Sequence, residues 1–126
     1  MARVLVLTGD LLFGSRVQGA LAAAGLEVEL VGDRSGLAAR LPLAGAGAGD
    51  AAAALVVDLT DAQLDGAQIV ESLRAEGRLA GVRTLAFYSH VDAQARRRAQ
   101  RAGFDLVVPR SRMAREGAEL VTRLLQ

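Results

Sequence analysis

The chain has 126 residues, a length that fits one domain with one hydrophobic core. It holds no cysteine and a single histidine, which excludes disulfides, cysteine nucleophiles and multi-histidine metal sites and is compatible with a reducing cytoplasm. Fifteen arginines against fourteen acids give a net charge of +1, and no apolar run is long enough for a signal peptide or membrane span. We therefore expect a cytoplasmic protein without membrane contact.

Short apolar runs typical of strands alternate with segments whose apolar residues recur at helical spacing. Asp10 and Asp92 stand at N-cap positions of two predicted helices, and Gly25 and Gly103 end those helices. In chain order the predicted elements are a strand over 3–8, a helix over 11–24, a strand over 26–31, a turn over 33–36, a short helix over 37–43, a strand over 54–58, a polar loop over 59–66, a helix over 67–77, a strand over 82–88, a loop over 89–92, a helix over 93–102, a strand over 105–109 and a final helix capped by Ser111.

This alternation predicts the fold class. Five strands separated by helices in one small chain favour an α/β fold with a parallel sheet, right-handed crossovers and helices on both faces, in three α/β/α layers. The Ala/Gly run at about 44–53 is predicted as a flexible surface loop, because it cannot bury side chains to offset the entropy of ordering it. It is not expected to be a domain linker, because the halves that flank it are too small to fold alone. Residues 1–126 are therefore expected to form a single domain.

Asp58 is the first candidate functional residue. It ends the apolar run that begins at Ala54, and ligands of open parallel sheets bind just outside the carboxyl ends of the strands. The alternative is that Asp58 only caps a turn, which aspartate does often.

With Asp58 ending the third strand and Ser89 following the fourth, the pattern resembles the response-regulator receiver family. An Asp-Gly pair at 65–66 and an Ala-Gly pair at 102–103 add to the resemblance, which covers nearly the whole chain. It implies a five-stranded parallel sheet of flavodoxin-like, CheY-like (βα)5 topology. It also implies that the Asp58 position accepts a phosphoryl group, while Ser89 contacts a phosphate oxygen and couples its presence to conformation.

The acidic pocket that this resemblance implies is degenerate. Receivers hold Mg²⁺ with an acidic pair directly after the first strand, where this chain has Thr8 and Gly9. The nearby acid, Asp10, is expected to cap a helix, which compromises it as a metal ligand. We predict no resident Mg²⁺ or other cofactor; Asp10 and Asp58 are the candidate ligands should a metal bind.

The phosphate-binding cation is also displaced. Receivers carry a lysine followed by proline after the fifth strand, whereas here Pro109 takes the lysine position and Arg110 follows one residue later. Because strand side chains alternate in direction, this shift is expected to aim Arg110 elsewhere. With several charge-stabilising groups missing, efficient phosphoryl transfer to Asp58 is not expected. We predict that Asp58 is a retained polar residue that hydrogen-bonds Ser89 or loop amides.

Arginines gather in the last third of the chain. In the helix over 93–102, Arg97 and Arg101 lie opposite a stripe of alanines and are expected to face solvent. Such a face can be merely solvated, or it can dock an acidic partner or the phosphates of a nucleic acid. In receivers this region is the usual output or dimerisation surface. The candidate interaction surface comprises Arg96, Arg97, Arg101, Arg112 and Arg115.

We therefore predict a pseudo-receiver, a signalling or protein-interaction domain that regulates a partner without efficient phosphorylation and is not an enzyme. Its expected partner is a kinase, an output protein or a second copy bound through residues 93–125. Two alternatives stay open. One is an atypical regulator phosphorylated at Asp58, with Asp10 or Asp61 for the metal and Arg110 for the phosphate. The other is a nucleic-acid module that uses the basic region Arg96–Arg115.

Two further residues are assigned no ligand. His90 is predicted as a loop residue rather than a metal ligand. A dinucleotide-binding loop starting at Gly9 fails, because the second glycine of its G-x-G-x-x-G spacing is replaced by Leu11.

Overall fold

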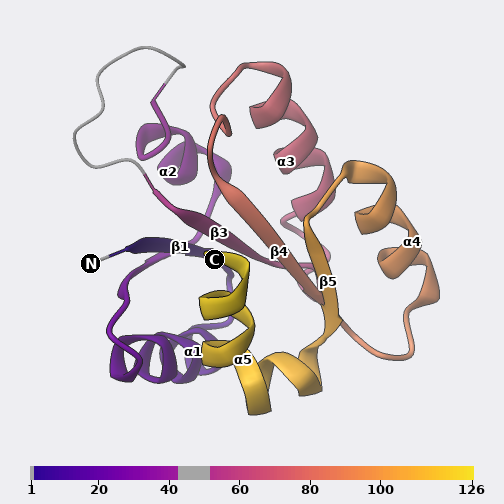
Figure 1. Cartoon of the computed structure of the whole chain (residues 1–126). Coiled ribbons are helices and arrows are strands. Elements are labelled where there is room, and N and C mark those ends of the chain that lie inside the picture. The colour runs from indigo at the N-terminus through magenta and orange to yellow at the C-terminus, as the bar shows by residue number, and fades with distance from the viewer. Residues whose placement is uncertain (1, 43–51) are drawn as a thin grey trace.

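The computed structural model describes residues 2–42 and 52–126, in which five parallel strands form one sheet between two layers of helices (Figure 1). The predicted α/β class and three-layer architecture are confirmed. In chain order the elements are β1 (Arg3–Leu7), α1 (Leu11–Ala23), β2 (Glu27–Val31), α2 (Arg34–Ala39), β3 (Ala54–Asp58), α3 (Gly66–Ala75), β4 (Arg83–Tyr88), α4 (Ala93–Ala102), β5 (Leu106–Pro109) and α5 (Arg110–Leu124).

The strands are ordered β2-β1-β3-β4-β5, the flavodoxin-like order. All five residues of the central strand β3 are buried, as its apolar composition requires. The register pairs Leu7 with Val57 and Asp58 with Phe87, so β1, β3 and β4 end together at one edge of the sheet. This edge, which we call the carboxyl edge, carries every strand-end residue singled out from the sequence.

The helices divide between the two faces of the sheet. Because strand side chains alternate in direction, Val4 and Val6 pack under α1 and α5, while Leu5 and Leu7 pack under α2, α3 and α4. Figure 1 shows α1 and α5 side by side on one face of the sheet. The core is aliphatic apart from a few aromatic rings, chief among them the pair Phe13 and Phe87, whose centroids lie 5.2 Å apart.

Several predicted helix ends are confirmed by their hydrogen bonds. The Asp10 carboxylate accepts from the Phe13 amide at 3.0 Å, and the Asp92 carboxylate accepts from the Ala95 amide at 3.0 Å. Gly103 ends α4 in the left-handed conformation, with φ +85°. Helix α4 has the predicted bounds because both of its ends carry such signals.

Two predicted helix starts are wrong by two or more residues, and the helices predicted over 37–43 and 67–77 end at Ala39 and Ala75. The second helix begins at Arg34 rather than 37, because the Asp33 side chain accepts from the Gly36 amide at 2.7 Å and makes the supposed turn the first turn of the helix. Helix α5 begins directly after β5, since Pro109 supplies its N-cap with φ −65°, and Ser111 lies inside the helix instead of capping it. The predicted flexible loop at 44–53 falls, except for its last two residues, outside the described residues. Within the described ranges, no helix is long and apolar enough to cross a membrane.

Candidate functional site

The Asp58 carboxylate is buried, with 1% of the residue exposed, and both of its oxygens accept hydrogen bonds. The Thr8 hydroxyl donates to Oδ2 at 2.7 Å. The Thr60 amide and hydroxyl donate to Oδ1 at 2.7 and 2.6 Å. The loop amide expected beside Asp58 is thus that of Thr60, whereas Ser89 is not among its partners. We call Thr8, Asp58 and Thr60 the carboxylate cluster.

Thr8 holds this cluster to the start of α1. The Thr8 hydroxyl accepts a hydrogen bond from the Asp10 amide at 3.0 Å while it donates to Asp58. Its methyl group packs against α1, where a Cβ added to Gly14 would lie 3.0 Å from Thr8 Cγ2. The sequence showed Thr8 only as a missing acid; its donor role follows from a small hydroxyl at a buried strand end opposite a carboxylate.

The two other acids near the cluster are engaged elsewhere. Asp10 caps α1 with Oδ1 and faces the Arg110 guanidinium with Oδ2, at 3.4 Å. The Asp61 carboxylate lies over Gly9, where an added Cβ would come within 2.3 Å of Asp61 Oδ2. Glycine at position 9 therefore leaves the space that the Asp61 side chain fills.

These acids do not form the donor set that Mg²⁺ requires. Mg²⁺ takes oxygen ligands in octahedral geometry, usually from carboxylates that converge on one point. Across residues 2–42 and 52–126, no three His, Cys, Asp or Glu side chains are grouped to hold a metal ion. Both Asp58 oxygens already accept hydrogen bonds, and Asp10 caps α1 and faces the Arg110 guanidinium. The receiver-type metal site does not fit the residues present.

Arg110 turns toward α1 instead of toward Asp58. Its guanidinium carbon lies 4.0 Å from the centroid of the Phe13 ring, within cation–π distance. Its contact with Asp10 is long and half exposed, so it adds little stability. Arg110 is the first residue of α5 and not a strand residue, so the start of the helix sets its direction, and the expected strand alternation does not apply to it.

Ser89 and Arg110 share a cleft from which Asp58 is excluded. This open cleft of about 400 Å³ lies at the carboxyl edge, and Asp58 is not among its lining residues. The exposed His90 lies in the β4–α4 loop as predicted. The residues that line the cleft are Asp10, Thr60, Ser89, His90, Arg110, Ser111 and Ala114.

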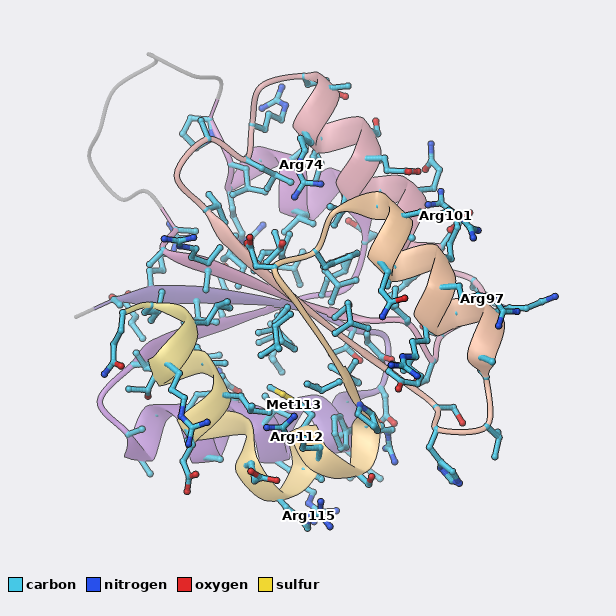
Figure 2. The ribbon with its side chains drawn as sticks, turned by 45° about the vertical axis from the view of Figure 1, so that its right-hand side comes forward. Arg74, Arg97, Arg101, Arg112, Met113 and Arg115 are labelled. Atoms are coloured by element: carbon cyan, nitrogen blue, oxygen red, sulfur yellow. The ribbon has the colours of Figure 1, made fainter. Side chains whose placement is uncertain are left out.

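The arginines of the predicted interaction surface fall into two groups. Arg97 and Arg101 point outward from α4, opposite the buried Ala99 and Ala102, as expected (Figure 2). Arg112 and Arg115 lie apart from them on the first part of α5 in the same view. Both α5 arginines pair with Glu116, at 3.6 and 3.8 Å. Within the described part of the chain, Arg96, Arg97 and Arg101 form no salt bridge.

Helix α4 is fixed to α3 by two polar contacts. Arg74 donates to the Ala102 carbonyl at 2.6 Å and to the Gly103 carbonyl at 3.4 Å, where α4 ends. Arg98 pairs with Glu71, and this hydrogen bond holds the pKa of the Glu71 carboxyl below its ordinary value. The other α4 arginines are thereby held outward.

Comparison with known proteins gives structural matches only. No protein-family model matches the sequence, and no curated protein does. A CheY-like receiver domain protein from Methanospirillum hungatei is 15% identical with a TM-score of 0.78, over 99% of this chain and 94% of that one. Chemotaxis response regulator CheY4 of Vibrio cholerae is 17% identical with a TM-score of 0.78, over 98% of each chain. The non-phosphorylated HemR receiver domain from Leptospira biflexa is 19% identical with a TM-score of 0.77, over 100% of this chain and 95% of that one. The chain therefore has the flavodoxin-like (βα)5 fold of CheY-like response-regulator receiver domains.

Proposed function

We propose that this chain is a pseudo-receiver, a non-enzymatic signalling or protein-interaction domain that regulates a protein partner in the cytoplasm without efficient phosphorylation of Asp58. The receiver fold supports a signalling role. The proposal that Asp58 is not efficiently phosphorylated is carried by the carboxylate cluster. In it the Thr8 and Thr60 hydroxyls and the Thr60 amide donate hydrogen bonds to both oxygens of the buried aspartate.

A phosphoryl-accepting carboxylate must reach phosphorus in line, and the charge on the transferring group must be neutralised. Here attack by either Asp58 oxygen would break a short hydrogen bond inside a site that is almost closed to solvent. The cation that could assist, Arg110, is stacked on Phe13. Neither the nucleophile nor its charge partner is arranged for the transfer.

The exposed α4 arginines support a protein partner for this domain: a kinase, an output protein or a second copy bound through residues 93–125. A nucleic acid is less favoured, because the basic residues do not form one continuous stripe and Arg112 and Arg115 already pair with Glu116. Steeply salt-dependent DNA or RNA binding that is lost on Arg97→Ala with Arg101→Ala would reverse this preference.

A Mg²⁺ titration, monitored by the backbone amide NMR shifts, tests whether the site binds the metal that phosphorylation of Asp58 would require. We expect no saturable change at residues 8–10 or 58–60 in the wild-type chain, because the described residues around them hold no group of acids arranged for a metal ion. Asp58→Asn is the matched control. Saturable shifts in the wild type that disappear in Asp58→Asn would favour the atypical phosphorylated regulator instead.

A further inference from the structure

The large hydrophobic side chains that are most exposed to water among the described residues belong to segments at the carboxyl edge. Leu11, Leu12 and Val91 are 73%, 82% and 78% exposed. Leu11 and Leu12 open α1 directly after β1, and Val91 lies in the loop between β4 and α4, so all three belong to the carboxyl edge. Single exposed apolar residues need no explanation, but a group around a cleft is typical of an interaction site.

The cleft of the candidate site is lined by residues next to these apolar positions. Its lining includes Asp10 and His90, the residues directly before Leu11 and Val91 in the chain. Leu11 and Val91 therefore each follow a lining residue, in two different segments of the carboxyl edge. Figure 1 shows the β4–α4 loop at the same end of the sheet as the junction of β5 and α5.

The cleft itself offers hydrogen-bond donors that the described chain does not use. The Ser89 and Ser111 hydroxyls and the His90 ring form no hydrogen bond with any described residue. Arg110 makes only the long contact with Asp10 and the stacking contact with Phe13. The N-terminus of α5 beside them has no side-chain cap. The cleft also holds the half-exposed Asp10 carboxylate, which caps α1 and faces Arg110; the remaining polar groups fit a carboxylate better than a cation.

We propose that Leu11, Leu12 and Val91, together with the cleft, dock an acidic amphipathic segment of a partner protein. Apolar side chains of the segment cover the two leucines and the valine, and one of its carboxylates enters the cleft to meet Arg110 and the serine hydroxyls. Arg96 and Arg97, which begin the exposed face of α4 just after Val91, extend the same charge preference. This proposal deepens the proposed function by naming a surface and a partner chemistry, and it rests on that function only in requiring a protein partner.

Other occupants fit the charges less well. A second copy docked through the same edge would bring the arginines of both copies together. A small anion alone would fill the cleft and leave Leu11 and Leu12 in water. A basic segment would face Arg110, Arg96 and Arg97.

The test uses a synthetic amphipathic peptide of leucine and glutamate at helical spacing, titrated into the full chain and followed by amide NMR shifts. We expect saturable shifts at residues 10–13, 89–92 and 110–112. Leu11→Ser with Leu12→Ser should weaken binding by about tenfold or more, because exposed anchor residues carry most of such binding energy. Arg123→Gln, a control at an exposed arginine in the last turn of α5 and away from the carboxyl edge, should change the affinity by no more than about twofold.

Three results would overturn the docking surface: no saturable shift, equal binding of a leucine–lysine peptide of the same pattern, or shifts confined to residues 96–101. Concentration-dependent self-association that is lost in the double serine variant would identify a second copy as the occupant and would also overturn it. Each of these results leaves the proposed function standing, because phosphorylation and Mg²⁺ binding at Asp58 are measured without these leucines.

Discussion

Thr8 determines the character of the site at the scale of single residues. A hydroxyl at this position gives Asp58 a donor where receivers place an acid, so the buried carboxylate is satisfied by protein groups alone. Because Thr8 also binds the Asp10 amide, one side chain links β1, β3 and the start of α1.

Replacing Thr8 by valine should therefore destabilise the fold. The change keeps the shape of the side chain but leaves Asp58 Oδ2 without its donor, and an unsatisfied buried polar group costs about 1–3 kcal/mol. Urea unfolding measures the loss. Thr8→Ser, which keeps the hydroxyl, should lose less unfolding free energy than the valine variant. If the valine variant is as stable as the wild type, the hydrogen bond from Thr8 to Asp58 does not stabilise the fold.

Glu29 should contribute to the pH dependence of stability. Hydrogen bonds from Arg3, at 2.7 Å, and from Arg40 hold the pKa of the Glu29 carboxyl below its ordinary value of 4.5. A lowered folded-state pKa stabilises the fold above pH 4.5, and this stabilisation is lost as the pH falls through the folded value. The side chain is 37% exposed, so solvent screening keeps the effect small.

The measurement is the difference in unfolding free energy between wild type and Glu29→Gln at neutral pH and at pH values well below 4.5. The variant should be the less stable at neutral pH, and the gap should narrow in acid. A gap that stays constant with pH would contradict the ion-pair explanation.

At the same scale, local residues were predictable and partners across the fold were not. Asp10 and Asp92 cap the helices that directly follow them, because a cap involves only neighbours in sequence. Thr8 is 50 residues from Asp58, so their hydrogen bond has no signature in a single sequence. The Thr60 amide lies two residues after Asp58, and its bond to Asp58 Oδ1 is the turn cap that the sequence left open as an alternative.

At the scale of elements, helix boundaries could be predicted where clear capping residues mark both ends. Helix α4 lies between Asp92 and Gly103 and matches its predicted bounds. Helix α2 is only one and a half turns long, and its cap Asp33 precedes Ser35 and Gly36, residues equally typical of a turn. The spacing of hydrophobic residues cannot identify a helix of this length, because the pattern needs a longer segment to repeat.

The packing of α3 against β3 depends on Gly66. A Cβ at this position would lie 2.4 Å from Val57 Cγ1 and 3.0 Å from Leu59 Cδ2. Gly66→Ala should cost about 1–3 kcal/mol by overpacking. Gly19→Ala, in an exposed part of α1 with nothing within 4 Å, should instead stabilise by about 0.5–1 kcal/mol. Thermal unfolding of both variants checks the contrast, and equal shifts in the same direction would contradict it.

At the scale of the whole molecule, the fold was predictable because the alternation of strands and helices admits few topologies. It also brings the ends of β1, β3 and β4 to one edge, so a site there could be expected from sequence. The sequence could not predict that this site divides into a buried carboxylate cluster and an open cleft. The division depends on the directions of the Arg110 and Thr60 side chains.

Helix placement likewise separates the arginines. They form one basic stretch in the sequence, but α4 and α5 lie on opposite faces of the sheet, so the molecule presents two groups (Figure 2). The unpaired group belongs to α4, which is held to α3 by Arg74 and Arg98.

The measurement that tests the central claim most directly is the intact mass of the chain after treatment with acetyl phosphate and Mg²⁺. A receiver with its acidic pair and lysine serves as the positive control, and Asp58→Asn is the matched variant. Because Asp58 is closed off by Thr8 and Thr60, we predict that the wild-type mass stays unchanged while the control receiver gains one phosphoryl group. A gain of one phosphoryl group in the wild type that is absent from Asp58→Asn would contradict the account.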